Sequence, residues 1–158
     1  MKKLNKKFLA ATFAVLLAFV AVLGISACNS EGSNNGGKFG VSGTEFEVNG
    51  QFVVARLNRT SSDTDWNYTV SGKGDMQCES DELSSNGKDC SGNTTQGVVD
   101  SHAFRFSADS AGEQTITFTY GNDSSKTVTA KVTTGDKGTV KTVEVSNASG
   151  ESTSYTVK

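Results

Sequence analysis

The 158-residue sequence contains one histidine, three cysteines and no proline. A structural zinc site uses four ligands, so His102 with Cys78 and Cys90 is one ligand short, and we predict no metal centre. No nucleophile-elbow pattern accompanies the single histidine, and a lone histidine on an alternating strand is typical of a structural residue. The sequence therefore predicts a protein that is not an enzyme and that needs no cofactor.

The one long apolar run lies at the N-terminus. Lysines at positions 2, 3, 6 and 7 precede an uncharged stretch over residues 8–23, which ends in Ile25-Ser26-Ala27-Cys28. A basic start, an apolar middle and small residues at the end are typical of an export signal. The last four residues resemble the lipobox of bacterial lipoproteins. That resemblance implies that residues 1–27 are removed and that Cys28 carries a diacylglycerol.

The lipobox resemblance implies an extracytoplasmic protein anchored by lipid to a cell membrane or cell envelope. An ordinary signal peptide and an uncleaved anchor remain the alternatives. Residues 1–27 hold four of the 15 Lys and Arg and none of the 17 Asp and Glu, so 11 basic and 17 acidic groups remain, a net charge of −6. This balance argues against nucleic acid as a partner, because phosphate binding needs basic patches.

Two further features concern the chain after Cys28. Residues 28–38 are rich in Gly, Ser and Asn, a composition typical of a flexible tether. In an oxidising compartment we expect Cys78 and Cys90 to form a disulfide, which would stabilise the fold by about 3 kcal/mol. The segment between these two cysteines and its flanks contain five acids, Asp75, Glu79, Asp81, Glu82 and Asp89. We predict that they lie in a solvated loop rather than in a calcium site, since the EF-hand spacing is absent.

Residues 39–158 show an apolar period close to two. The alternating runs lie at 46–48, 52–57, 66–70, 104–106, 115–120, 128–132 and 140–145, and a further hairpin follows at the C-terminus. Turn clusters rich in Gly, Asn and Ser separate these runs, and no segment shows the 3.6-residue period of an amphipathic helix. The pattern predicts one all-β domain, an immunoglobulin-like β-sandwich of seven to nine strands, with Trp66 in its core.

The order of motifs also resembles a known family. Residues 46–66 (FEVNGQFVVARLNRTSSDTDW) and 101–120 (SHAFRFSADSAGEQTITFTY) resemble the opening strands and the central segment of the chagasin family. Members of that family are immunoglobulin-like inhibitors of papain-type cysteine proteases. The resemblance implies the same fold, and a function that lies in three loops at one end of the sandwich, which enter the cleft of the protease.

The family's loop motifs correspond to three segments of this chain. The first loop falls at Asn58, Arg59, Thr60, Ser61 and Ser62, where Asn58 and Thr60 match, Arg59 replaces Pro and Ser62 replaces Gly. The second, Gly-x-Gly-Gly in the family, falls at Gly97, Val98, Val99 and Asp100, where only Gly97 matches. The third, Arg-Pro-Trp, is replaced by Gly121, Asn122 and Asp123, a change that we expect to make this loop flexible and polar.

Two functions are therefore expected from the sequence. In the first, the chain is a surface-tethered inhibitor of papain-like cysteine proteases, with these three loops blocking the active-site cleft. In the second, it is a non-inhibitory immunoglobulin-like lipoprotein that binds another cell-envelope protein or a glycan. Loss of proline and tryptophan from the loops is the feature that favours the second, because both residues contribute to tight loop-mediated binding.

Overall fold

The computed structural model describes residues 37–84 and 86–158. The predicted signal peptide, the lipidation site Cys28 and residues 28–36 of the tether lie outside the described residues. Lys38, which we assigned to the tether, belongs to the first strand of the domain. No helix within the described part is long and apolar enough to span a bilayer.

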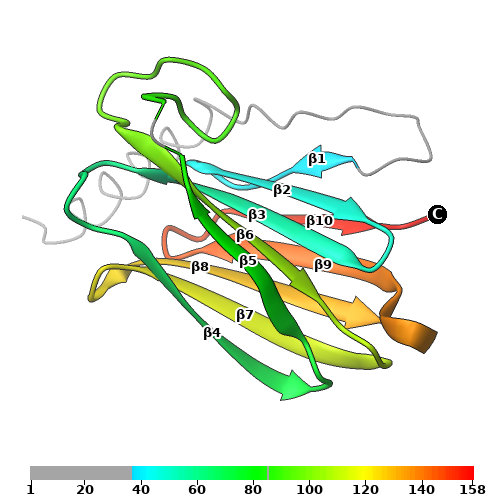
Figure 1. Cartoon of the computed structure of the whole chain (residues 1–158). Helices are drawn as coiled ribbons and strands as arrows, with labels where there is room; N and C mark the ends of the chain where they lie inside the picture. Colours follow the sequence, from blue (N-terminus) through cyan, green and yellow to red (C-terminus); the bar gives the residue numbers. More distant parts are fainter. Residues whose placement is uncertain (1–36, 85) are drawn as a thin grey trace, which may run out of the picture.

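Ten strands in this part form two antiparallel sheets of five strands each (Figure 1). The order in sheet A is β1-β2-β3-β6-β5, and the order in sheet B is β10-β9-β8-β7-β4. The strand bounds are β1 Lys38–Phe39, β2 Thr44–Asn49, β3 Phe52–Arg59, β4 Trp66–Lys73, β5 Gln77–Leu83, β6 Asp100–Ser107, β7 Gly112–Tyr120, β8 Asp123–Thr134, β9 Val140–Asn147 and β10 Ser152–Thr156. A 3₁₀ turn, Asp136–Gly138, connects β8 to β9.

The strand order confirms the immunoglobulin-like sandwich. Strands β2-β3-β6-β5 follow the A-B-E-D order of a constant-type domain, and β4-β7-β8 follow its C-F-G order. The β9–β10 hairpin extends sheet B beyond this frame, and β1 extends sheet A. The sequence predicted seven to nine strands, and the structure describes ten. The two that the apolar alternation missed are β1, which is only two residues long, and β5.

Strand β5 was missed because it lacks the usual apolar alternation. Its sequence, QCESDEL, was interpreted as part of a solvated acidic loop. Three of the five acids in that prediction, Glu79, Asp81 and Glu82, instead lie on β5, which pairs with β6 at the edge of sheet A. An edge strand faces solvent on one side, so it tolerates charges that an inner strand would bury.

The core is built from phenylalanines that meet between the two sheets. Phe118 of β7 lies with its ring centroid 6.1 Å from Phe46, 5.4 Å from Phe104 and 5.9 Å from Phe106, all three of sheet A. These four side chains are at most 1% exposed. Each buried side chain of this kind contributes about 1.5–3 kcal/mol relative to an exposed one. Edge-to-face and tilted contacts between the rings set how the two sheets face each other.

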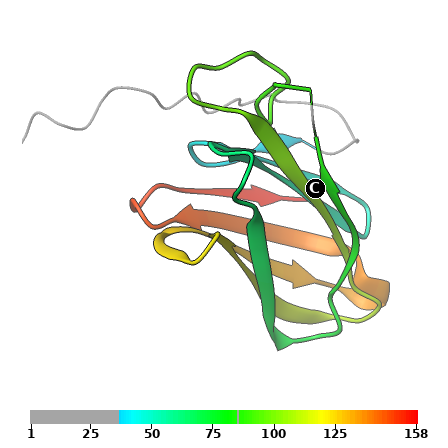
Figure 2. The ribbon, with the colours of Figure 1, turned by 60° about the vertical axis from the view of Figure 1, so that its left-hand side comes forward.

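The two sides of the sandwich differ. On one side, Phe39 of β1 stacks on Tyr155 of β10 with the ring centroids 5.1 Å apart, so aromatic rings cover the space between the sheets. On the other side lie the edge strands β4 and β5, joined by a short connection (Figure 2). Tyr68, Val70 and Leu83 on these strands are 37%, 36% and 50% exposed. This second side is therefore open.

The predicted disulfide is wrong, because Cys78 and Cys90 are both free thiols. Cys78 lies opposite Phe106 in the β5–β6 pairing, whereas the backbone N–H of Cys90 donates to Oδ1 of Asn58, which is level with Ser101. Along β6, Phe106 and Ser101 are about 17 Å apart at 3.4 Å per residue. Bridged cysteines have their Cα atoms within about 7 Å of each other, so the strand pairing separates the two.

We expect dithiothreitol to leave the urea midpoint of residues 37–158 unchanged, because these residues hold both sheets and the whole core but no disulfide. Burial raises the pKa of Cys90 to about 11, so this thiol stays protonated at neutral pH. In the folded protein iodoacetamide should therefore modify the half-buried Cys78 before Cys90, as peptide mass mapping can show. A urea midpoint that falls on reduction would indicate a disulfide and would contradict the separation of the two thiols.

Candidate functional site

The three predicted loops lie at one end of the sandwich. In the strand registers Arg59 pairs with Asp100, and Trp66 pairs with Tyr120. Four strand ends are therefore level with one another: the end of β3, the start of β6, the start of β4 and the end of β7. The connections that leave these points comprise, among the described residues, 60–65, 84 with 86–99, and 121–122, and we call them together the loop end (at the left in Figure 1).

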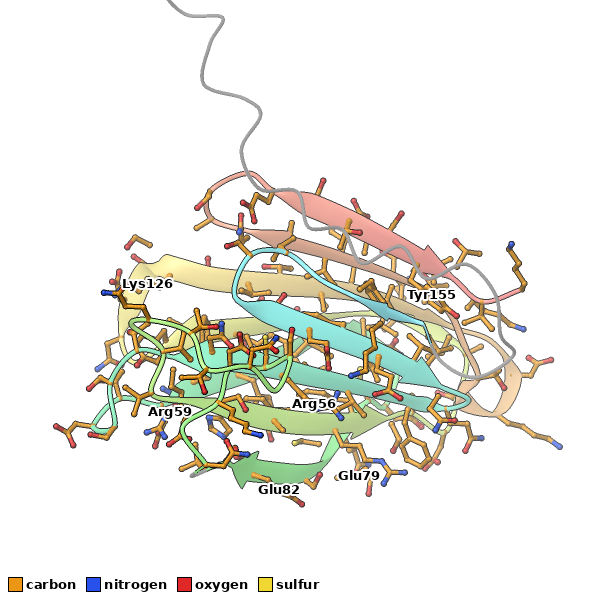
Figure 3. The ribbon with its side chains drawn as sticks, turned by 90° about the horizontal axis from the view of Figure 1, so that it is seen from above. Arg56, Arg59, Glu79, Glu82, Lys126 and Tyr155 are labelled. Atoms are coloured by element: carbon orange, nitrogen blue, oxygen red, sulfur yellow. The ribbon has the colours of Figure 1, made fainter. Side chains whose placement is uncertain are left out.

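Arg59 holds the first loop from inside. Its side chain is only 6% exposed, although it stands at the last position of β3 (Figure 3). The guanidinium donates from Nη2 to the carbonyl of Ser62 at 2.7 Å and from Nε to the carbonyl of Thr64 at 3.2 Å. Nη2 also lies 2.6 Å from the carboxylate of Asp65, and Nη1 lies 4.0 Å from that of Asp100.

This geometry corrects the assignment of Asn58 and Arg59 to the binding loop. Both residues belong to β3. The carbonyl of Asn58 accepts a hydrogen bond from Nε1 of Trp66 at 2.9 Å, and its side chain accepts one from the backbone of Cys90 at 2.7 Å. Asn58 and Arg59 therefore hold the frame, and the residues of this loop that are free to contact a partner are Thr60, Ser61, Ser62 and Asp63.

Tyr120 is a second support that the sequence did not reveal. Its hydroxyl accepts hydrogen bonds from the backbone N–H groups of Thr60 at 3.1 Å and of Ser61 at 2.9 Å. Its ring lies 5.2 Å from the ring of Trp66, which is half-buried at the loop end rather than central in the core. A tyrosine that ends an apolar strand carries no local signal that its hydroxyl supports a loop distant in sequence.

The second loop is anchored at both the strand and its own tip. The N–H of Val99 donates to the carbonyl of Arg59 at 2.8 Å, which places Gly97, Val98 and Val99 beside the first loop. Near the tip, the carboxylate of Asp89 accepts from the hydroxyl of Thr95 and from the backbone of Asn93 and Ser91. The Thr95 bond, followed by these backbone bonds, lowers the pKa of Asp89.

The third loop is a tight turn rather than a flexible segment. Only Gly121 and Asn122 separate β7 from β8. The N–H of Gly121 donates to the carbonyl of Asp65 at 2.8 Å, and the side chain of Asn67 donates to the carbonyl of Gly121 at 3.2 Å. Gly121 has φ of 58°, and a Cβ there would stand 2.9 Å from Thr64, so glycine suits the position.

The turn is polar, as the sequence predicted. The hydroxyl of Ser125 bonds the carboxylate of Asp123 and lowers its pKa. Lys126, which follows the turn on β8 (Figure 3), has its Nζ 5.6 Å from the ring centroid of Tyr120. No aromatic side chain extends from this turn, so it supplies no wedge of the kind that the third loop of the chagasin family supplies.

The surface of the loop end is therefore polar with one apolar point. Exposed hydroxyl and carboxylate groups come from Thr60, Ser62, Asp63, Asp65 and Asp123. Val99, 38% exposed, is the large apolar side chain among the residues described there. Such a surface makes hydrogen bonds and ion pairs with a partner more readily than broad apolar contact.

The one histidine of the chain is buried between the sheets rather than exposed at the loop end. His102 lies on the inner face of β6, 4% exposed, stacked on Phe104 with ring centroids 4.1 Å apart. Its Nε2 contacts the carboxylate of Asp81 on β5. Within residues 37–84 and 86–158, no three His, Cys, Asp or Glu side chains gather in a way that could hold a metal ion.

Comparison with known proteins adds no family assignment. No protein-family model, no curated protein and no solved structure matches this chain. The resemblance to the chagasin family thus stays a prediction from the residues quoted above.

We expect Arg59→Ala to lower the free energy of unfolding by about 2–3 kcal/mol, because it leaves two loop carbonyls and the Asp65 carboxylate without their donor. Arg56→Ala is the matched control on the outer face of the same strand (Figure 3). Arg56 is 32% exposed, and its partner Glu45, although 11% exposed, keeps a second ion pair with Lys38, so the loss of Arg56 should cost only about 1 kcal/mol. Urea denaturation measures both, and equal losses would contradict the internal role of Arg59.

We expect Tyr120→Phe to speed amide exchange at Thr60 and Ser61, because the ring remains but the acceptor of both N–H groups is removed. The cost in stability should be about 1 kcal/mol. Hydrogen exchange followed by NMR measures the two amides directly. Tyr68→Phe is the control, since Tyr68 lies on the open side of the sandwich; unchanged protection in Tyr120→Phe would show that the loop is held without the hydroxyl.

Proposed function

We propose that the chain is a lipid-anchored, extracytoplasmic inhibitor of papain-like cysteine proteases, and that its loop end blocks the active-site cleft. The observation that carries the proposal is the convergence of the three loop segments at one end, where Arg59 and Tyr120 hold the first loop by its backbone. A loop that is ordered before binding loses less conformational entropy on association. In this proposal Arg59 supplies the rigidity that proline supplies in the family.

Inhibition by this surface would be steric and reversible. The first loop presents Thr60, Ser61 and Ser62 at the end of the molecule, and Val99 of the second loop lies beside them. Their hydroxyl groups and backbone could pair with the polar walls of a cleft, while Val99 supplies apolar contact. No thiol of the inhibitor takes part, because Cys90 is buried and Cys78 lies on β5, away from the loop end.

A second candidate is a binding module that does not inhibit a protease. The observation in its favour is the third segment, a two-residue turn that carries no aromatic side chain. A surface of two projecting loops with exposed carboxylates suits a basic patch on another cell-envelope protein, or the hydroxyl groups of a glycan. This candidate uses the same loop end but not the cleft of an enzyme.

We expect residues 37–158 to inhibit papain at sub-micromolar concentration, in competition with a small peptide substrate. Val99→Asp should weaken inhibition at least about tenfold, because a charge at the apolar point loses its contact and must be desolvated. Lys131→Asp is the control, since Lys131 is exposed on β8 of sheet B. If micromolar protein leaves the papain rate unchanged while circular dichroism shows a folded β domain, the inhibitor proposal is wrong.

A further inference from the structure

The free edge of strand β4 differs from the other sheet edges of this domain. The four edge strands are β1 and β5 of sheet A and β10 and β4 of sheet B. Natural sheets protect edges by making them short, charged or irregular. Strand β1 has two residues and β10 has five. Strand β5 has a register shift between Cys78 and Ser80 and carries three acids, of which Glu79 and Glu82 are seen along it in Figure 3.

Strand β4 has little of this protection, and its one backbone irregularity is Gly72, with φ of 113°, next to its end. It runs for eight residues, Trp66–Lys73, and pairs with β7 without a register shift. Its one charged residue is Lys73 at its end. Side by side on its inner face stand Tyr68 and Val70, both more than a third exposed. Tyr68 packs edge-on against Phe104 and Phe106, so the remaining part of its ring is an uncovered extension of the core.

We propose that β4 pairs with β4 of a second copy, antiparallel and about a two-fold axis through Thr69, so that sheet B continues from one molecule into the other. Antiparallel pairing of one strand with itself is self-complementary, as a two-fold interface requires. This register places Tyr68 opposite Val70 of the second copy, and Val70 opposite its Tyr68. An aromatic side chain opposite a β-branched one is a favourable cross-strand pair, and here each covers the open side of the other.

Charge complementarity supports the same register. It places Lys73 of one copy opposite Asp65 of the other at both ends of the paired strands. Asp65 pairs with Arg59 of its own molecule, yet its side chain is 51% exposed, and no ion pair to Lys73 occurs among the residues that the structure describes. Two opposite-charge pairs thus favour this register. A pairing of β5 with itself would instead bring Glu79, Asp81 and Glu82 against the same three acids.

The register also matches at its remaining positions. Trp66 stands opposite Gly72 of the second copy, and an aromatic residue across from a strand glycine compensates for its missing side chain. Asn67 stands opposite Ser71, and Thr69 opposite Thr69. The acidic β5 strands of the two copies come to the same side of the joined sheet, so the dimer is weak and depends on concentration. Its two loop ends point in opposite directions, because the paired strands are antiparallel.

The association is tested on residues 37–158 by sedimentation from micromolar to submillimolar concentration. We expect a monomer–dimer equilibrium, and we expect Val70→Lys to weaken it at least about tenfold, because a charge would face the joined apolar surface. Val157→Lys is the matched control, since Val157 is equally exposed, at 37%, beyond β10 on the other side of the sandwich. Both variants are checked for the wild-type circular dichroism spectrum.

Register is tested by cross-linking. Thr69→Cys should give a disulfide-linked dimer under mild oxidation, well above the background of the unsubstituted chain. Thr117→Cys is the control, because Thr117 lies directly opposite Thr69 on the inner strand β7, out of reach of a second copy. A monomer at every concentration, equal cross-linking of the two variants, or a dimer lost with Val157→Lys but kept with Val70→Lys would each overturn the proposal. None of these outcomes bears on protease inhibition.

Discussion

Phe118 is the side chain on which the two sheets depend. Its ring contacts Phe46, Phe104 and Phe106 of the opposite sheet, and all four are almost completely buried. Because interiors are close-packed, such a cluster fixes the distance and the angle between the sheets. The ends of β3, β4, β6 and β7 are then held at constant relative positions, and the loops that leave these ends start from a rigid base.

At the loop end, order comes from polar groups. Proline would restrict the first loop through its fixed φ, but this chain has no proline. Arg59 instead binds two carbonyls of the loop, and Tyr120 accepts two of its N–H groups. A buried guanidinium with several acceptors is costly unless it is fully paired, so the arrangement also ties the loop conformation to an intact Asp65 and Asp100. Loop order and fold stability are therefore coupled.

The sheet edges are covered on one side of the sandwich and open on the other. Aromatic stacking between Phe39 and Tyr155 covers one side. On the other side, β5 is protected by charge and a register shift, whereas β4 keeps free backbone groups beside Tyr68 and Val70. This asymmetry lets one domain carry two separate surfaces, a loop end suited to a partner and a strand edge suited to a second copy. The two surfaces adjoin at Asp65, which pairs with Arg59 and directly precedes β4, and at Trp66, the first residue of β4.

The two-residue period by itself determined that this domain is an all-β sandwich, and it located the long strands, because alternation reports directly which face of a strand is buried. The loop segments came instead from the family resemblance, and four of the residues assigned to them lie on strands: Asn58 and Arg59 on β3, Asp100 on β6 and Asp123 on β8. The period did not reveal strand β5, because this edge strand pairs through its backbone and its acids do not alternate with apolar residues. The separation of Cys78 from Cys90 and the inward turn of Arg59 were decided only by tertiary structure. Both depend on which strands lie side by side. Contacts between residues distant in sequence, such as Tyr120 and Thr60, cannot be recognised from the residues next to either one in the chain.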